Sequence, residues 1–289
     1  MILITGSTGH FGKATIDFLL KKIPASSIAA LARDKNKATD LAAKGIDVRI
    51  GDYTDFDSMV KAFTGIEKLL LISSSDMNDR GGQHVNAINA AKKAGVKHIV
   101  YTSADIRDPG QSAIAFITDG HVKAENQIKN SGMTFTILKN NLYAECIPMF
   151  LGEKLPETGV FFPAGTGKVP FAARIDMVEA AAHVLTTAGH ENMEYFISSG
   201  ISYSFSDVAD ILSELSGKKI AYIDPPKEAF QEQLIKAGVP EMYVSFTAAF
   251  AEAIKQDEFN LPNATLEKLL GRKPASLKAF LQSIYFPNK

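Results

Sequence analysis

Three glycines spaced three residues apart, Gly6, Gly9 and Gly12, are the first sign of chemistry in this chain, and they lie in the segment ITGSTGHFG. An apolar, strand-like stretch precedes the segment, and an amphipathic helix is predicted from about Phe11. Between a strand and a helix, the first glycine permits a tight turn, the second lets the backbone approach a pyrophosphate, and the third lets the helix pack closely on the strand. The loop therefore predicts a dinucleotide site formed by Gly6, Ser7, Thr8, Gly9, His10, Phe11 and Gly12.

A different phosphate loop, G-x-x-x-x-G-K-[ST], nearly fits the same segment. Ser7 stands where that loop needs its first glycine, and Ala14 follows Lys13 where it needs Ser or Thr, so we reject it. The helix after the glycines is expected to bury a face formed by Phe11, Ala14 and Phe18.

The residue at the end of the second predicted strand selects between NAD and NADP. An acidic side chain there would bind the ribose 2′-hydroxyl of NAD, whereas an arginine suits the 2′-phosphate of NADP. The residue is Arg33, which can pair bidentately with phosphate, and Asp34 after it suits a cap for the next helix. The sequence thus favours NADP. Further cofactor candidates follow the third and fourth strands, although each suits an ordinary turn as well: Asp52, Tyr53, Ser73, Ser74 and Ser75.

Short apolar strands alternate with helix-length segments over the first half of the chain. The strands are ILIT, SIAALA, DVRI, KLLLI, HIVYT and TFTIL. This alternation predicts a doubly wound α/β fold of Rossmann type, with a parallel sheet covered by helices on both faces. After Leu138 the chain is rich in aromatic residues, Gly and Pro, and from Asp176 helices dominate. We therefore expect an NADP-binding domain over residues 1–140, joined by a later strand near 194–198, and a smaller, mostly helical substrate-binding lobe over 141–289.

Composition argues against several other classes of protein. The chain has 289 residues, 46% of them apolar, and a formal net charge of -1 with only short basic clusters, so we expect no nucleic-acid partner. No apolar run approaches the length of a membrane span, and the six histidines and one cysteine show no metal-ligand spacing, so we expect no membrane and no metal. Cys146 is the only cysteine and no signal segment precedes the first strand, which predicts a cytoplasmic protein. The oligomeric state stays open.

Several segments resemble a known family. ITGSTGHFG, ALAR, GDYTD, KAGVKHIVYTS, SGMTFTILKNNLYAE and PAGTGKV are similar to segments of the NmrA-like class of atypical short-chain dehydrogenase/reductases, above all its NAD(P)H:quinone oxidoreductases and triphenylmethane reductases. The resemblance implies a Rossmann fold, an NADP(H) cofactor and hydride transfer to a quinone or a related small aromatic acceptor. It also leaves an alternative, because NmrA-like proteins include non-catalytic NADP(H)-sensing redox regulators that act through a protein partner.

The wider superfamily uses a Tyr-x-x-x-Lys pair after the fifth strand, and this chain lacks the pair at that position; the only Tyr-x-x-x-Lys, Tyr285 to Lys289, is interpreted as a coincidence. Counting back from Gly132 and Glu125 places Ile117 in the tyrosine position and His121 in the lysine position. Reducing a ketone yields an alkoxide, whereas reducing a quinone yields a phenolate-like oxygen that needs about 8 kcal/mol less help from an acid. The missing pair thus argues against ketone reduction and leaves quinone reduction open. The resemblance suggests that the catalytic candidate, His121, lies beside the nicotinamide and binds ribose or donates a proton; a packed histidine is an equal alternative.

The remaining site candidates also follow from the resemblance. We expect the segment after the sixth strand to hold the nicotinamide carboxamide, Thr102 and Ser103 to occupy the superfamily's serine position, and Arg174 either to reach the cofactor or to precede a helix capped by Asp176. The carboxamide candidates are Lys139, Asn140 and Asn141. A flat apolar pocket for the acceptor is expected from Tyr143, Met149, Phe150, Phe161 and Phe171, although core packing is the commoner role for any one of these aromatic residues.

Overall fold

The fold comes from a computed structural model, which describes residues 1–287 except 75, 77 and 153. Within these residues the chain forms two compact units, each made of three segments. Unit 1 comprises Met1–Ala104, Phe116–Asn140 and Ile175–Phe196. Unit 2 comprises Asp105–Ala115, Asn141–Arg174 and Ile197–Lys289. The assignment of an NADP-binding part and a substrate-binding part stays a prediction.

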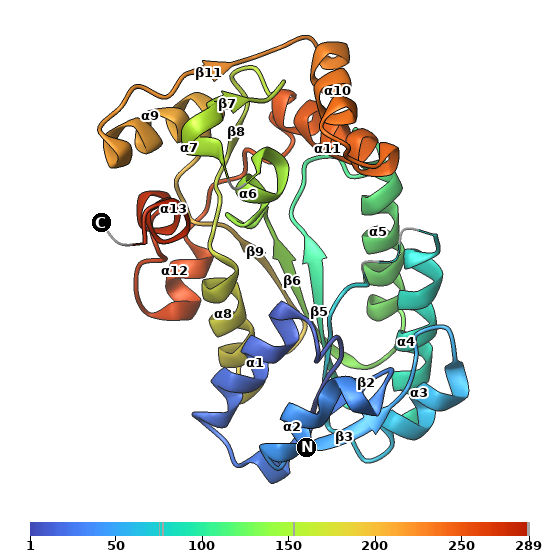
Figure 1. Cartoon of the computed structure of the whole chain (residues 1–289). Coiled ribbons are helices and arrows are strands. Elements are labelled where there is room, and N and C mark those ends of the chain that lie inside the picture. Colours follow the sequence, from blue (N-terminus) through green and yellow to red (C-terminus); the bar gives the residue numbers. More distant parts are fainter. Residues whose placement is uncertain (75, 77, 153, 288–289) are drawn as a thin grey trace. The chain divides into compact units, whose positions relative to one another are not determined.

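Unit 1 is built on a sheet whose strands are β1 (Ile2–Ile4), β2 (Ile28–Ala32), β3 (Asp47–Ile50), β4 (Lys68–Leu71), β5 (His98–Ala104), β6 (Thr134–Asn140) and β9 (Met193–Ile197). Among the described residues their order is β3-β2-β1-β4-β5-β6-β9, and β1 to β6 pair in parallel (Figure 1). The strand order reverses between β1 and β4, as in a doubly wound sheet, so the predicted α/β fold of Rossmann type is confirmed.

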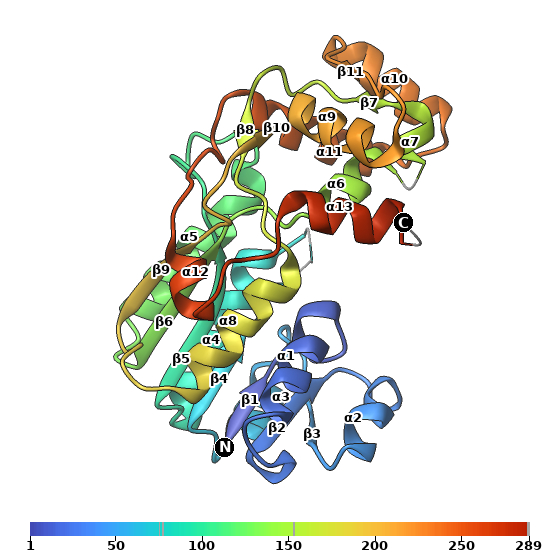
Figure 2. The same ribbon diagram turned by 90° about the vertical axis from the view of Figure 1, so that its left-hand side faces the viewer.

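Helices cover both faces of this sheet. Figures 1 and 2 show α3 (Phe56–Phe63), α4 (Arg80–Ala94) and α5 (Ala115–Lys129) on one face, and α1 (His10–Leu20) and α8 (Arg174–Thr186) on the other. The shorter α2 (Thr39–Ala43) and two 3-10 turns, Ala25–Ser27 and Lys35–Ala38, complete the connections. Asp55 and Asp79 cap α3 and α4, because their carboxylates accept hydrogen bonds from backbone N–H groups of the first turn.

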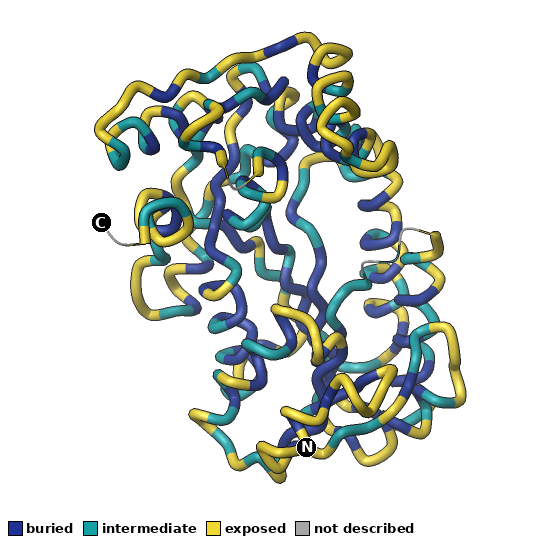
Figure 3. The backbone as a smooth tube through the Cα atoms, viewed as in Figure 1, coloured by how far each residue is buried: buried dark blue, intermediate teal, exposed yellow. Residues whose placement is uncertain are grey.

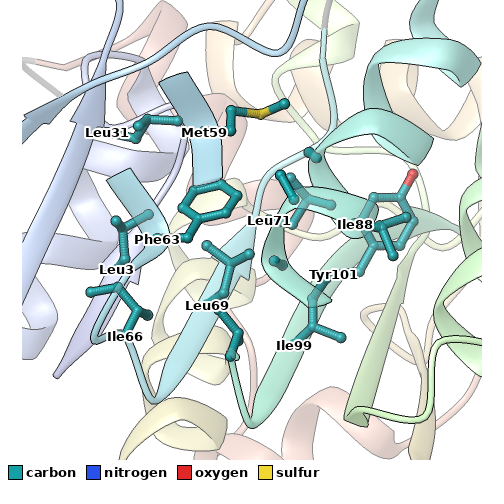
Figure 4. Packing of buried hydrophobic residues seen from close by; sticks show 14 of the residues in the cluster. Leu3, Leu31, Met59, Phe63, Ile66, Leu69, Leu71, Ile88, Ile99 and Tyr101 are labelled. Atoms are coloured by element: carbon teal, nitrogen blue, oxygen red, sulfur yellow. The ribbon is translucent and has the colours of Figure 1, made fainter. Parts of the chain in front are cut away.

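Alternate residues of the strands form the core under α3, α4 and α5. Because successive side chains of a strand point to opposite faces, every second residue meets the helices. Figure 4 shows this cluster, which includes Leu3, Leu69, Leu71, Ile99, Tyr101, Met59, Phe63 and Ile88. All eight are fully buried, and burial of one such side chain contributes about 1.5–3 kcal/mol. Figure 3 shows the inner strands of this sheet as largely buried, whereas the edge strands β3 and β9 are mostly half-buried or exposed.

The buried face of α1 differs from the predicted one. Ala14 and Phe18, which we expected to be buried, are half-buried, whereas Ile16 and Leu19 are fully buried. Residues 12, 16 and 19 share one side of the helix, and Gly12 packs directly on the loop backbone. Of the predicted face, Phe11 is therefore buried, and Ala14 and Phe18 are only half-buried.

Unit 2 is mostly helical, as predicted. Its helices are α6 (Cys146–Leu151), α7 (Leu155–Thr158), α9 (Phe205–Ser216), α10 (Lys227–Lys236), α11 (Glu241–Lys255), α12 (Thr265–Leu270) and α13 (Leu277–Tyr285). In the described residues β10 (Tyr203–Ser204) pairs antiparallel with β8 (Lys168–Val169), and β11 (Tyr222–Ile223) pairs in parallel with β7 (Val160–Phe161). A capping box of Ser204 and Asp207 starts α9.

Phenylalanine rings fill the centre of unit 2. Phe150 stacks on Phe162 with ring centroids 5.6 Å apart, and Phe162 meets Phe205 at 4.5 Å. Phe230 meets Phe162 edge-on at 5.6 Å, and Phe250 meets Phe150 at 5.5 Å. All five are buried, and we call them the aromatic core.

Candidate functional site

The glycine loop joins β1 to α1 and leaves backbone N–H groups at the start of the helix. Gly6 has a φ of +56°, in the left-handed region that favours glycine, and its carbonyl accepts a hydrogen bond from the Gly9 N–H at 3.0 Å. Gly9 is the N-cap of α1, and among the described residues no side chain caps this end. The first amides of a helix have no acceptor within it, so His10, Phe11 and Gly12 present N–H groups at the positive end of the helix dipole. This arrangement suits a phosphate.

Gly12 and Ser7 make the loop compact. A Cβ at Gly12 would lie 2.3 Å from the Gly6 carbonyl oxygen and 2.8 Å from the Ser7 Cα, so no larger residue fits without a shift of the backbone. The Ser7 hydroxyl donates a hydrogen bond to the carbonyl of Leu31 in β2 at 2.7 Å, and Ser7 is fully buried. The side chain of Ser7 therefore points into the fold, which leaves its backbone to meet a ligand.

A groove of about 560 Å³ opens beside this loop, within the range of about 300–1,000 Å³ that is usual for ligand sites. Its walls come from the loops that follow β1, β2, β3 and β4, where doubly wound sheets bind ligands. The predicted residues that line it are Gly6, Thr8, Gly9, His10, Phe11, Gly12, Arg33, Asp52, Tyr53, Ser73 and Ser74. Leu31, Ile72 and Gln83 line it too. Sequence reasoning missed the first two because apolar residues at strand ends read as core.

Arg33 follows β2, exposed and on the wall of the groove. Asp34 accepts a hydrogen bond from the Asn36 N–H at 2.9 Å and caps the next turn, so its carboxylate serves the backbone. Asp52, also on the wall, accepts hydrogen bonds from the Thr54 N–H at 2.9 Å and from the Thr54 hydroxyl at 2.7 Å. These hydrogen bonds, and then the charge of Arg33, hold the pKa of Asp52 below its usual value.

Tyr53 connects the strand ends around the groove by hydrogen bonds. Its hydroxyl hydrogen-bonds to the Thr5 hydroxyl and lies 2.9 Å from the carbonyl oxygen of Ile72. The Ile72 N–H donates to the Thr5 Oγ1 at 2.9 Å, so the three residues link the ends of β1, β3 and β4. Burial raises the pKa of Tyr53 and outweighs the opposite effect of the hydrogen bond to Thr5, so the phenol stays neutral.

The serines after β4 are held by neighbouring side chains. The Ser73 N–H donates to the Thr102 Oγ1 at 2.9 Å, and the Ser74 hydroxyl donates to the Gln83 Oε1 at 2.8 Å. Thr102 is buried in β5, so its hydroxyl positions the loop after β4. Ser75, the third predicted serine, lies outside the described residues.

His121, on α5, lies at one end of a buried chain of hydrogen bonds. Its Nδ1 lies 2.8 Å from the Tyr101 hydroxyl of β5, which lies 3.1 Å from the Nδ1 of His84 on α4. The Nε2 of His84 accepts a hydrogen bond from the Ser74 N–H at 2.8 Å. Sequence reasoning found His121 and missed Tyr101 and His84. The available signal was a tyrosine within an apolar strand, since a buried phenol needs a hydrogen-bond partner.

Lys139, a predicted carboxamide residue, lies in an ion-pair network. Its Nζ is 3.0 Å from carboxylate oxygens of both Glu125 and Glu194. Burial alone would lower the pKa of Lys139, but the two carboxylates outweigh it and raise the pKa. Glu125 also accepts a hydrogen bond from the Ser103 hydroxyl, and Lys129 pairs with Glu194 at 2.6 Å. The side chains of Ser103 and Lys139 are thus committed to this network.

Asn140 ends β6 and is buried, while Asn141 begins a segment of unit 2. The Asn141 side-chain amide donates to the Phe259 carbonyl at 3.0 Å, and its oxygen accepts from the Leu142 N–H at 2.9 Å. Asp105 lies 3.4 Å from the same amide. Asn141 therefore joins three segments of unit 2.

The predicted pocket residues of unit 2 divide by exposure. Phe150 and Phe171 are buried, the first in the aromatic core and the second edge-on against Phe205 at 6.1 Å. Phe161 is half-buried and its ring meets Phe230 at 6.3 Å. These three pack against other phenylalanines, and their place in a pocket for the acceptor stays a prediction. Tyr143 lies under the guanidinium of Arg174 at 5.1 Å, and Met149 is exposed; both stay predictions.

Arg174 is the first residue of α8, and its backbone N–H donates to the Glu145 carboxylate at 3.0 Å.

Two kinds of feature are absent from the part of the chain that the structure describes. No helix there is long and apolar enough to cross a membrane. The same residues contain no group of three or more His, Cys, Asp or Glu side chains that could hold a metal ion.

Comparison with known proteins identifies the family. The NmrA-like family matches residues 1–281. The chain belongs to the NmrA-like family. Among NmrA-like relatives, quinone oxidoreductase 2 of Escherichia coli (strain K12) is 37% identical over 289 residues, which cover 100% of both chains. The predicted family resemblance is confirmed.

Two solved structures are similar to this NmrA-like chain throughout. Citrobacter sp. triphenylmethane reductase complexed with NADP(H) has a TM-score of 0.91 and 39% identity, covering 98% of this chain and 100% of that chain. An NADPH-dependent quinone oxidoreductase of Escherichia coli complexed with NADPH has a TM-score of 0.92 and 36% identity, covering 99% of this chain and 100% of that chain.

Proposed function

We propose that this protein is an NADPH-dependent oxidoreductase that transfers hydride to a quinone or a related aromatic acceptor, such as a triphenylmethane dye. The observation that carries the proposal is the glycine loop beside the groove of unit 1, with Arg33 on the wall. The relatives support the same function, because one is named a quinone oxidoreductase and two solved relatives are complexed with NADP(H) or NADPH.

The groove fits a dinucleotide by its own geometry. The amides of His10, Phe11 and Gly12 meet the pyrophosphate, and the absence of a side chain at Gly9 leaves room for it. Arg33 pairs with the 2′-phosphate, while Asp34 is occupied as a cap and offers no ribose contact. When bound, NADPH supplies the hydride. The backbones of Ser73 and Ser74 continue the groove beyond β4.

The acceptor class follows from the groups that would assist its oxygen. Ile117, in the position of the superfamily's tyrosine, is buried and apolar, and His121 stands in place of the lysine. A hydroquinone oxygen needs little assistance from an acid, so these residues suit a quinone better than a ketone. We keep His121 of unit 1 as the residue beside the nicotinamide, and Tyr143 and Met149 of unit 2 as candidates for a pocket that binds the acceptor.

The alternative of a non-catalytic regulator receives no support from the three relatives described above, whose names describe reductases. We also propose that the partner of this protein is a small aromatic acceptor and that its compartment is the reducing cytoplasm. The second rests on Cys146, because a single thiol cannot form an intramolecular disulfide.

The decisive experiment follows NADPH oxidation with a panel of quinones and triphenylmethane dyes. We expect turnover with at least one quinone or dye, and negligible turnover with simple aliphatic ketones, which serve as the control. Strong ketone reduction would reveal an acid that we have missed. Tight NADPH binding without oxidation by any acceptor in the panel would contradict the proposed enzyme and favour a regulator.

A further inference from the structure

A chain of four groups crosses the interior of unit 1 from the loop after β4 to α5. It runs from the Ser74 N–H to His84, then to Tyr101, then to His121, with donor–acceptor distances of 2.8, 3.1 and 2.8 Å. Tyr101 and His84 are fully buried, and His121 is 7% exposed. Figure 4 shows the ring of Tyr101 within the hydrophobic cluster and its oxygen at the edge. Water is therefore largely excluded from the chain.

The first link sets the direction of every other hydrogen bond. A peptide N–H can only donate, so the Nε2 of His84 carries no proton, and a neutral His84 must carry its proton on Nδ1. The backbone of Gly120 also accepts a hydrogen bond from His84. A protonated Nδ1 of His84 cannot accept from Tyr101, 3.1 Å away, so the Tyr101 hydroxyl donates to the Nδ1 of His121. The proton of a neutral His121 is left on Nε2. If His121 instead carried its proton on Nδ1, both histidines would direct an N–H group at the Tyr101 oxygen. The Tyr101 hydroxyl proton would then have no acceptor among these groups, at a cost of about 1–3 kcal/mol.

We infer that His84 and Tyr101 are positioning residues that hold His121 as the neutral Nε2–H tautomer, so that His121 presents a hydrogen-bond donor of fixed orientation. The inference rests on the proposed function in one respect: the donor serves the acceptor oxygen or the cofactor. A neutral imidazole in this role polarises a carbonyl without carrying a charge.

Burial and the charges around these hydrogen-bonded groups keep both imidazoles neutral. Burial, and then the positive charge of Arg80 on α4, lower the pKa of His84 to about 4, against a smaller effect of the Gly120 backbone. Burial, Arg80 and His84 in that order lower the pKa of His121. Burial likewise raises the pKa of Tyr101, on which Arg80 acts in the opposite sense and Glu125 and Tyr53 in the same sense.

The hydrogen bonds from Ser74 to His121 position the His121 ring and do not relay protons. If His121 gave up its Nε2 proton while taking one from Tyr101, and Tyr101 took one from His84, His84 would become an imidazolate. The Ser74 peptide N–H cannot replace that proton. The acceptor therefore takes its hydride from NADPH and its proton from water, while His121 donates a hydrogen bond and keeps its own proton.

The test reads the tautomers directly, by nuclear magnetic resonance of the full chain with ¹⁵N-labelled histidine, with His121→Ala and His84→Gln used to assign the signals. We expect His121 to be neutral and protonated on Nε2, and His84 to be neutral and protonated on Nδ1, between about pH 5 and 8. A charged His121, or one protonated on Nδ1, would overturn the inference. This measurement needs no substituted tyrosine, so it stands even if Tyr101→Phe fails to fold.

The matched pair of variants is Tyr101→Phe and Tyr195→Phe. The first removes the phenol that orients His121; the second removes a phenol 2.8 Å from the Nδ1 of His190, a similar pair elsewhere in unit 1. With Tyr101→Phe we expect His121 to populate both tautomers and kcat with a quinone to fall by about tenfold to a hundredfold, with KM for NADPH little changed. Tyr195→Phe should leave the His121 signals and kcat as in the wild type. An unchanged His121 tautomer in Tyr101→Phe would overturn the inference.

The two proposals fail separately. If the tautomers are as expected but the wild-type protein oxidises NADPH with no quinone or dye, the proposed function fails and the positioning of His121 stands. If a quinone is reduced but His121 has the other tautomer, the function stands and the positioning inference fails.

Discussion

The groove of unit 1 lies beside a run rich in glycine, whereas the aromatic core of unit 2 is built from phenylalanines. The first depends on missing side chains and the second on large ones. At the glycine loop, missing side chains leave backbone N–H groups directed to a groove. In the aromatic core, large side chains close on one another, as Phe162 does on Phe205 at 4.5 Å. A glycine pattern indicates a ligand because backbone geometry is local. A run of aromatic residues indicates burial, because the partners of each ring come from distant segments.

The largest effect should come from Phe162→Ala, because the side chain is fully buried and contacts three other rings. We expect the free energy of unfolding to fall by about 3–5 kcal/mol, measured by urea denaturation. Phe116→Ala is the control: its side chain is 55% exposed, and a change below about 0.5 kcal/mol is expected. Native stability of Phe162→Ala with lost binding of a quinone would turn the aromatic core into a pocket and remove the contrast between the units.

Gly12→Ala tests the loop. A Cβ would lie 2.3 Å from the Gly6 carbonyl oxygen, so the loop must shift, at a cost of about 1–3 kcal/mol. We expect NADPH affinity, measured by titration calorimetry, to fall by about tenfold to a hundredfold. Gly110→Ala, where a Cβ would meet nothing within 4 Å, should bind NADPH as the wild type does. Equal binding by both variants would show that the loop does not hold the pyrophosphate.

Lys139→Met separates a structural role from a binding role within unit 1. Removing the cation leaves Glu125 and Glu194 without their shared partner, and we expect a loss of about 1–3 kcal/mol of unfolding free energy. Lys44→Met breaks the exposed pair with Asp17 and should cost less than about 1 kcal/mol. If Lys139→Met loses affinity for NADPH at unchanged stability, the carboxamide role predicted from the family holds instead.

The same network predicts a pH dependence. Burial would raise the pKa of Glu194, but Lys129 and Lys139 outweigh it and lower the pKa. A carboxyl with a lowered pKa stabilises the fold above its unfolded value of about 4.3, and this contribution disappears as the pH falls through the folded pKa. Thermal unfolding followed from neutral to acidic pH should therefore show a smaller acid-induced loss in Lys139→Met than in the wild type. Parallel curves for the two proteins would argue against the network.

The smallest effect should be that of Arg33→Ala on cofactor preference. We propose that the Arg33 guanidinium pairs with the 2′-phosphate, which NADPH has and NADH lacks. We expect the ratio of NADPH to NADH affinity to fall by about tenfold, with NADH affinity almost unchanged. An equal loss for both cofactors would place Arg33 on a part of the groove that does not read the 2′-phosphate.

Local patterns explain why much of unit 1 could be predicted. Strand periodicity and the spacing of Gly6, Gly9 and Gly12 depend on neighbouring residues, and the fold and the loop followed from them. The partners of side chains do not: Tyr101 and His121 are 20 residues apart, and no periodicity relates them. The ion pair of Lys139 with Glu194 could not be predicted either, because Glu194 lies on β9, a strand that joins the sheet much later in the chain.

In unit 2 the partners of side chains are even harder to predict from the sequence. Phe150 and Phe171 have the composition of a binding pocket, but whether a ring faces a ligand or another ring depends on segments such as α9 and α11 that fold against it. Asn141 shows the same thing for a polar residue, since its amide is used by Phe259, more than a hundred residues away in sequence.

The hydrogen bond from the Ser7 hydroxyl to the Leu31 carbonyl joins the glycine loop to β2, which ends at Ala32, directly before Arg33. If the loop holds the pyrophosphate and Arg33 the 2′-phosphate, as we propose, this hydrogen bond couples cofactor affinity to cofactor preference. A substitution that shifts the loop is then expected to change both the affinity for NADPH and its preference over NADH.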